Sequence, residues 1–286
     1  MSVETNLATL RQFIFDNFYL PLGDENPEES DIFLFGEQHR DMEFRRKYCK
    51  FIDLYREVFP NERVVVLIEG VPSMQAFQPS DATRFCTLDE FWRETTHQAK
   101  TLCPADDDEK QCYTPLEYLQ NKILTLGWDD QMPCVQGHYL WSQAMERYFE
   151  LKDLLFDMCK KDQFNDKEKV ARLSMLMNAV YQLFNQYNKE SDRSVFLRDH
   201  TLVKTVRKTS KLFTKVFVIA GRDHFDISRK TPLAKLIMDE TSEDPLSQKK
   251  MTIIFNNKVN KFISPLAKLF SQHVEEFSPY WKRTGS

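Results

Sequence analysis

RVVVLIEG, residues 63–70, is the stretch of the sequence that decides the fold class. It contains an unbroken run of apolar, mostly β-branched side chains, followed by Glu69 and Gly70. A strand with one face in water alternates apolar and polar residues, whereas a continuous apolar run is typical of a strand buried on both faces of a parallel sheet. The stretch therefore predicts a parallel sheet with helices on both of its faces.

Similar runs recur along the chain and alternate with segments of helical periodicity. The other predicted strands are residues 31–35, 124–127, 215–220 and 251–255, and the predicted helices between and before them are residues 7–18, 42–59 and 231–237. Parallel strands need long crossover connections, which are usually helices. We therefore expect an α/β fold, with a largely parallel sheet flanked by helices.

The range 138–210 is predicted to be mostly helical, with breaks near Asn165 and Ser191. It interrupts the strand–helix alternation, so we expect a helical insertion or cap within a single α/β domain of residues 1–286. Two further helices are predicted, one beginning with the capping pattern at 114–117 and one at 265–277.

Composition excludes several classes of protein. The net charge is −4 and the pI is about 5.9, whereas a nucleic-acid-binding protein usually carries a basic stripe, so we expect no nucleic-acid partner. No segment approaches the roughly 18 apolar residues of a membrane span, and the N-terminus does not resemble a signal peptide. These features predict a cytoplasmic protein without a membrane span, and non-classical secretion as an effector is the alternative.

Ionisable side chains follow four of the predicted strands. Glu37 and His39 follow the first, Glu69 the second, Asp129 and Asp130 the third, and Asp223 and His224 the fourth. In open α/β sheets, ligands bind beyond the carboxyl ends of the strands. If the strands are parallel, these groups gather at one edge of the sheet, and the sequence predicts a site there.

Each of these residues also has a structural interpretation. Glu37 could cap the following helix, where Asp41 and Glu43 are suited to the helix dipole. Glu69 would be costly to bury without a partner, and Asp129 with Asp130 could form a turn. Arg198, on a predicted helix, could be a plain salt-bridge partner.

The functional interpretation is acid–base or metal chemistry. Two histidines with carboxylates suit a divalent transition metal such as Mn, Co, Fe or Zn, and the metal ligands would be His39, Glu37, Glu69 and His224. Without a metal, His39 could activate water as a general base oriented by Glu37 or Glu69. Arg198 would then stabilise the oxyanion. The GxSxG, GxxxxGK[ST] and HExxH patterns are absent.

The motifs resemble those of the Tiki/TraB/ChaN and erythromycin-esterase-like superfamily, and the haem-binding ChaN branch is the most similar. The resemblance covers about residues 31–226 and rests on GEQH at 36–39, IEG at 68–70, GWDD at 127–130, RD at 198–199 and GRDH at 221–224. It implies an α/β fold with site residues His39, Glu37, Glu69, Arg198 and His224. The sequence departs from the family pattern at Arg222–Asp223, where a small or amide residue is more usual.

Three functional hypotheses follow. The first is a hydrolase, either esterase or metalloprotease-like, that acts on an ester or amide bond of a small molecule or peptide. The second, implied by the ChaN branch, is a haem- or iron-binding protein in which Tyr139, Trp141 and Met145 line a porphyrin. The third is a non-catalytic effector that keeps the fold for partner binding.

Overall fold

The structure is a computed structural model that describes residues 3–37, 41–76, 123–130, 133–239 and 243–257. The chain forms two compact units. Of the described residues, the first contains 3–37, 41–76, 123–130, 133, 193–239 and 243–257, and the second contains 134–192. The predicted helical range 138–210 contains two long helices, and its role as a cap stays a prediction.

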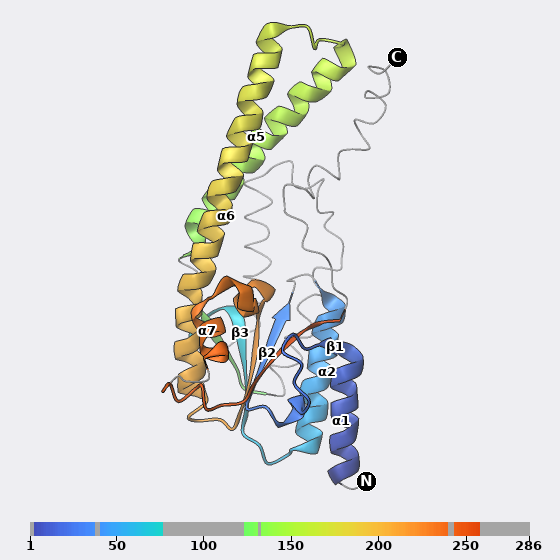
Figure 1. Ribbon diagram of the computed structural model, residues 1–286, viewed down its shortest axis with the longest axis vertical. Helices are drawn as coiled ribbons and strands as arrows, with labels where there is room; N and C mark the ends of the chain where they lie inside the picture. The colour runs from blue at the N-terminus through green and yellow to red at the C-terminus, as the bar shows by residue number, and fades with distance from the viewer. Residues whose placement is uncertain (1–2, 38–40, 77–122, 131–132, 240–242, 258–286) are drawn as a thin grey trace. The chain divides into compact units, whose positions relative to one another are not determined.

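The first unit carries the sheet (Figure 1). Its strands are β1 (Phe18–Tyr19), β2 (Ile32–Glu37), β3 (Val64–Pro72), β4 (Thr125–Asp129), β5 (Lys215–Gly221) and β6 (Met251–Asn256). Its helices are α1 (Val3–Asn17), α2 (Met42–Val58) and α7 (Pro232–Met238), with the short 3-10 helices η1 (Pro27–Glu29), η3 (Arg222–Phe225) and η4 (Ile227–Arg229). The long helices are α5 (Cys134–Lys161), which lies in the second unit, and α6 (Lys167–Thr209), which runs from the second unit into the first.

The six strands form one sheet in the order β1-β6-β2-β5-β3-β4. Strands β6, β2, β5, β3 and β4 are parallel to one another, and only the short edge strand β1 pairs antiparallel within the described sheet. The predicted α/β class with a largely parallel sheet is therefore confirmed. Because β2, β5, β3 and β4 are parallel neighbours, their carboxyl ends meet along one edge.

Successive side chains of each strand point to opposite faces of the sheet, so each face has its own hydrophobic core. Phe33 and Phe35 of β2 pack with α1 and α2, and the rings of Phe33 and Phe217 stack with centroids 4.9 Å apart. Leu34 and its neighbours on the opposite face pack against Leu202 of α6 and Leu233 of α7. Both faces are covered, which explains why the strands read as continuous apolar runs.

One prediction of a helix boundary is wrong and another is confirmed. The predicted break near Asn165 is present, since α5 ends at Lys161 and α6 begins at Lys167. The predicted break near Ser191 is wrong, because α6 is a continuous helix of 43 residues. It contains no Gly or Pro, and an interior Ser, Asn or Asp costs a helix only about 0.7 kcal/mol or less.

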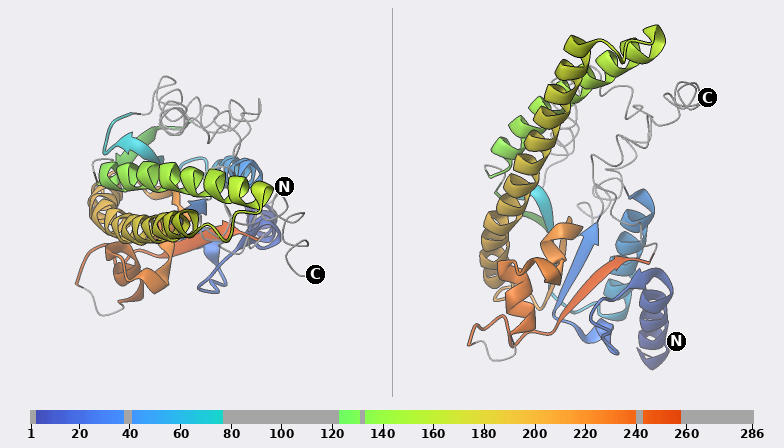
Figure 2. Two further views of the ribbon diagram at one scale, coloured as in Figure 1. Left: turned by 90° about the horizontal axis from the view of Figure 1, so that it is seen from above. Right: turned by 45° about the horizontal axis from the view of Figure 1, so that its top comes forward.

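The second unit is built on α5 and the first part of α6, which lie side by side (Figure 2). Their buried contacts include Met145 and Phe184, and the ring of Trp141 lies 5.5 Å from that of Phe184. The Met and Phe residues of this range thus form a small core of their own.

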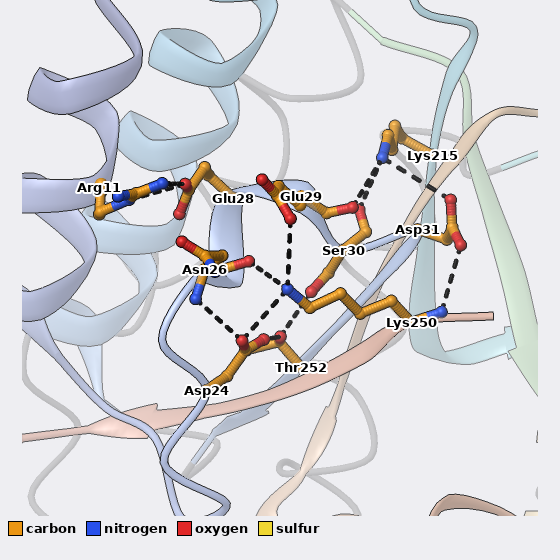
Figure 3. A network of polar contacts seen from close by, with 10 residues as sticks. All are labelled: Arg11, Asp24, Asn26, Glu28, Glu29, Ser30, Asp31, Lys215, Lys250 and Thr252. Carbon is orange, nitrogen blue, oxygen red and sulfur yellow. Dashed lines mark hydrogen bonds and ion pairs between the residues drawn. The ribbon is translucent and has the colours of Figure 1, made fainter.

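At the amino ends of the strands, a polar network ties η1 to the sheet (Figure 3). Arg11 donates from Nε to the buried Glu28 at 2.7 Å. Lys250 lies 3.2 Å from Asp24, and Lys215 donates to the carbonyl of Ser30 at 2.9 Å. Charged groups thus fasten this edge, which is opposite to the edge where β2, β3, β4 and β5 end.

Two predicted helices, at 114–117 and 265–277, lie outside the described residues. Within the described part of the chain, no helix is long and apolar enough to cross a membrane.

Candidate functional site

The end of β3 is irregular, and this irregularity sets the position of Glu69. The pairing of β3 with β4 shifts register between Ile68 and Pro72, and Gly70 has a φ of 82°. This left-handed conformation favours glycine. The N–H of Gly70 donates to Oδ2 of Asp129 at 2.8 Å, so the bulge at the end of β3 is held to the end of β4.

Five side chains meet beyond the ends of β3, β4 and β5, and we call them the strand-end network. They are Glu69, Asp129, Arg198, Asp199 and His224. Two come from strand ends, two from consecutive positions on α6, and His224 from η3 directly after β5. The network therefore gathers residues that are up to 155 positions apart in the sequence, as the interval from Glu69 to His224 shows.

Arg198 is paired with two carboxylates. Its Nε and Nη2 donate to the two oxygens of Asp129, each at 2.7 Å, and Nη2 also donates to Glu69. A bidentate arginine–carboxylate pair of this kind fixes both orientation and distance. The guanidinium additionally lies 5.6 Å from the ring centre of Trp128. Arg198 thus holds the ends of β3 and β4 together.

His224 is buried and lies between two carboxylates. Its Nδ1 is 2.5 Å from Oδ1 of Asp199, and its Nε2 is 3.6 Å from Oε1 of Glu69. Burial alone would lower the pKa of His224, but the negative charge of Glu69 and the hydrogen bond to Asp199 raise it to about 9. The imidazole is therefore a cation at neutral pH, with an N–H directed at each carboxylate.

Glu69 is the most accessible carboxylate of the network. Its side chain is 14% exposed, whereas those of Asp129 and Asp199 are 1% and 0% exposed. Its second oxygen accepts the N–H of Gly221 at 2.5 Å. A small molecule arriving from solvent would consequently meet Glu69 before the other two.

One oxygen of Asp199 is not used by the rest of the described chain. Asp199 is fully buried, and its Oδ2 has no hydrogen-bond partner among the described residues. Buried carboxylate oxygens are normally paired. The unpaired oxygen lies on the side chain that orients His224.

Glu37 belongs to a second polar cluster, on the α2 face of the sheet. Arg45 donates to both of its oxygens, at 2.7 and 3.0 Å, and the hydroxyl of Tyr48 donates to it at 3.2 Å. Burial raises the pKa of Tyr48 well above its usual value, so the phenol keeps the proton that it donates. Glu37 has the same strand parity as Phe33 and Phe35, which face α2.

The residues that follow β2 have separate structural roles at the start of α2. Asp41, and not Glu37, caps α2, because its side chain accepts the N–H of Phe44 at 3.0 Å. Glu43 lies in the first turn and pairs with Lys47. His39 lies outside the described residues, so its predicted role stays a prediction.

The described residues alone do not fit a metal centre. Of the predicted ligands, Glu37 faces Arg45, Glu69 faces Arg198, and Nδ1 of His224 faces Asp199. Within the described ranges, no group of three or more His, Cys, Asp or Glu side chains is arranged to hold a metal ion. The metal prediction also includes His39, which lies outside the described residues, so it stays a prediction.

The residues predicted to line a porphyrin lie on α5. Met145 is buried, Trp141 packs against Phe184 and Tyr187, and Tyr139 is exposed. Met145 and Trp141 thus serve the packing of α5 against α6. The haem prediction stays untested.

The pairing partners were the part that the sequence did not reveal. The sequence pattern places Asp129 at a strand end and Asp199 in the RD motif, but it does not indicate that Asp129 binds Arg198 or that Asp199 binds His224. Arg45 and Tyr48 were missed as polar partners, because they share a helix face with Phe44 and Phe51 and the pattern there indicates core. A basic residue on an otherwise buried helix face was the available signal.

No protein-family model, no curated protein and no solved structure matches the chain. The resemblance to the Tiki/TraB/ChaN and erythromycin-esterase-like superfamily therefore stays a prediction.

Proposed function

We propose that the protein is a hydrolase of ester or amide bonds, and that Glu69 and His224 form its acid–base pair. One observation carries the proposal: the buried His224 is held at Nδ1 by Asp199, while its Nε2 lies 3.6 Å from Glu69. Histidines oriented by a buried carboxylate and directed at a second titratable group are suited to proton transfer.

The proposed reaction begins at Glu69, the most exposed of these groups. Glu69 accepts a proton from a water molecule as the water oxygen bonds to the acyl carbon. The proton then passes to the leaving oxygen or nitrogen as the acyl bond breaks, which yields an acid and an alcohol or amine. His224 hydrogen-bonds Glu69 after a movement of about half an ångström, since a regular hydrogen bond measures about 3 Å.

Arg198 and Asp129 act as positioning residues in this proposal. Nε of Arg198 donates to Asp129, and Nη2 donates to both Asp129 and Glu69. The arrangement supports a role in fixing Glu69 more directly than the predicted role at the oxyanion. The role predicted for His39, that of a general base oriented by Glu37 or Glu69, stays a prediction.

The pairing of Glu37 favours a second candidate function, a non-catalytic protein that keeps the polar clusters to stabilise strand ends. Glu37 is buried and hydrogen-bonded by Arg45 and Tyr48, as expected of a structural ion pair. In this case, the strand-end network would likewise be structural, and its substitution would change stability alone.

The two candidates are separated by hydrolysis assays on a panel of aryl esters and aryl amides. The variant His39→Ala/His224→Ala should lose turnover while its far-ultraviolet circular dichroism stays that of the wild type. A double variant that retains turnover contradicts the hydrolase proposal, and so does a wild type that shows no turnover on the panel.

A further inference from the structure

The arginine that departs from the family pattern, Arg222, lies beside the strand-end network and differs from the other arginines of this edge. Arg45 and Arg198 are each committed to buried carboxylates. Arg222 instead lies over the ring of Phe255, with its guanidinium carbon 4.9 Å from the ring centre. Among the described residues, no carboxylate pairs with it.

The charged groups nearest to Arg222 in the sequence do not neutralise it. Asp223 pairs with Arg229 at 3.1 Å, and Asp226 lies 3.9 Å from Arg229. Arg222 itself is half-buried. Its charge is therefore retained at the edge of the sheet, and its hydrogen-bond donors are not used by these acids.

The backbone holds Phe255 in place beneath the guanidinium. A Cβ atom at Gly36 would lie 2.2 Å from the Cε1 atom of Phe255 and 3.3 Å from the Cα of Arg222. Gly36 pairs with Phe255 on one side and with Ala220 on the other. The absence of a side chain at Gly36 thus lets the ring of Phe255 lie against β2, next to the start of η3.

Arg222 lies on the same face of the sheet as the strand-end network. Phe255 belongs to the core beneath α6 and α7, as does Trp128, against whose ring His224 packs. Glu69 reaches the N–H of Gly221, the residue before Arg222. In the sheet order, β2 lies between β6, which carries Phe255, and β5, which Glu69 contacts, so one strand separates the ring under the guanidinium from the backbone that Glu69 contacts.

We propose that Arg222 is an anion-binding residue that receives a carboxylate or phosphate group of the substrate. The inference rests on the proposed function, and it assigns the substrate class as small acidic esters or amides. A guanidinium presents a planar fork that matches the oxygens of both groups. Stacking on Phe255 orders this fork before the ligand arrives, which reduces the entropy that binding must offset.

The test is a binding titration of the full chain that needs no turnover. Succinate and inorganic phosphate are titrated at constant ionic strength, and binding is followed by the amide NMR signals of residues 215–225. The wild type should bind both ions saturably, and the Arg222→Gln variant should have dissociation constants at least tenfold higher for both ions. Arg147→Gln is the matched control, because it removes the same charge from an exposed pair on α5 and should bind as the wild type does.

Two results would overturn the inference: no saturable binding by the wild type, or equal binding by wild type and Arg222→Gln. Succinate binding without phosphate binding would restrict the substrate class to carboxylates, and the reverse would restrict it to phosphates. Because the titration involves no catalysis, its failure is distinguishable from a failure of the hydrolysis assays. A wild type that binds these ions but hydrolyses nothing would support the anion site and contradict the hydrolase proposal.

Discussion

Nδ1 of His224 lies 2.5 Å from Oδ1 of Asp199, and both side chains are buried. Asp199 is adjacent on α6 to Arg198, which binds Glu69 and Asp129. One turn of α6 therefore supplies both the cation that binds Glu69 and the carboxylate that holds His224. A buried histidine cation is stable only when such partners compensate its lost hydration.

The charge of His224 should make stability fall as the pH rises. Its pKa is raised from 6.5 to about 9 in the folded protein, so its contribution is fully present below pH 6.5 and is lost as the pH rises through about 9. A shift of this size corresponds to roughly 3 kcal/mol. Urea unfolding of wild type and His224→Gln should show a stability difference that shrinks between pH 6.5 and 9. A difference that is flat across this range would contradict the protonated state.

Asp199→Asn should reduce turnover while leaving substrate binding nearly unchanged. The amide oxygen can still accept the Nδ1 hydrogen, but the negative charge that stabilises the imidazolium is lost. We expect kcat on the best substrate of the panel to fall on the order of 10²-fold, with KM within a factor of about two. Asp157→Asn, which makes the same change on exposed α5, is the control. Equal losses of kcat in both variants would refute the positioning role.

The cluster around Glu37 should behave as a coupled structural pair. Arg45 and Glu37 are only 5% and 6% exposed, so Arg45→Met leaves a buried carboxylate without its cation and should cost about 3–5 kcal/mol. Glu37→Gln/Arg45→Met should cost less than the sum of the single variants. Chemical unfolding of the wild type, Glu37→Gln, Arg45→Met and the double variant measures this coupling. Strictly additive losses of unfolding free energy would contradict the pairing.

Gly36→Ala should destabilise the fold through Phe255. The new Cβ would overlap the ring, and such overpacking typically costs about 1–3 kcal/mol. In the background of Phe255→Leu, the same substitution should cost clearly less, because the obstructing ring atoms are gone. Thermal unfolding of the wild type and Gly36→Ala, and of Phe255→Leu and Gly36→Ala/Phe255→Leu, compares these costs. An equal cost in both backgrounds would show that the ring is not the obstacle.

The sheet could be predicted because its signal is local. Runs such as residues 64–68 are apolar at every position, and this pattern is typical of a strand covered on both faces. The polar residues that follow Phe35, Ile68 and Ala220 could be assigned to one edge once the strands were taken as parallel. The two-residue strand β1 was not predictable, because two residues carry no periodicity.

The partners within the site could not be predicted from local pattern. Arg198 and Asp129 are 69 positions apart, and their pairing depends on where α6 crosses the sheet. Glu37 and Glu69 look equivalent as strand-end acids, yet pleating sends Glu37 toward α2, whereas Glu69 meets Arg198 of α6. The conformation of Gly70, which displaces the end of β3, has no signature beyond the glycine itself.

Activation of water by Glu69 is tested by measuring kcat/KM of Glu69→Gln on the ester and amide panel. Glu43→Gln, which changes an exposed glutamate of α2, is the matched control. We expect kcat/KM to fall at least 10²-fold for Glu69→Gln and to keep the wild-type value for Glu43→Gln. Unchanged kcat/KM in a folded Glu69→Gln variant would show that Glu69 does not activate water.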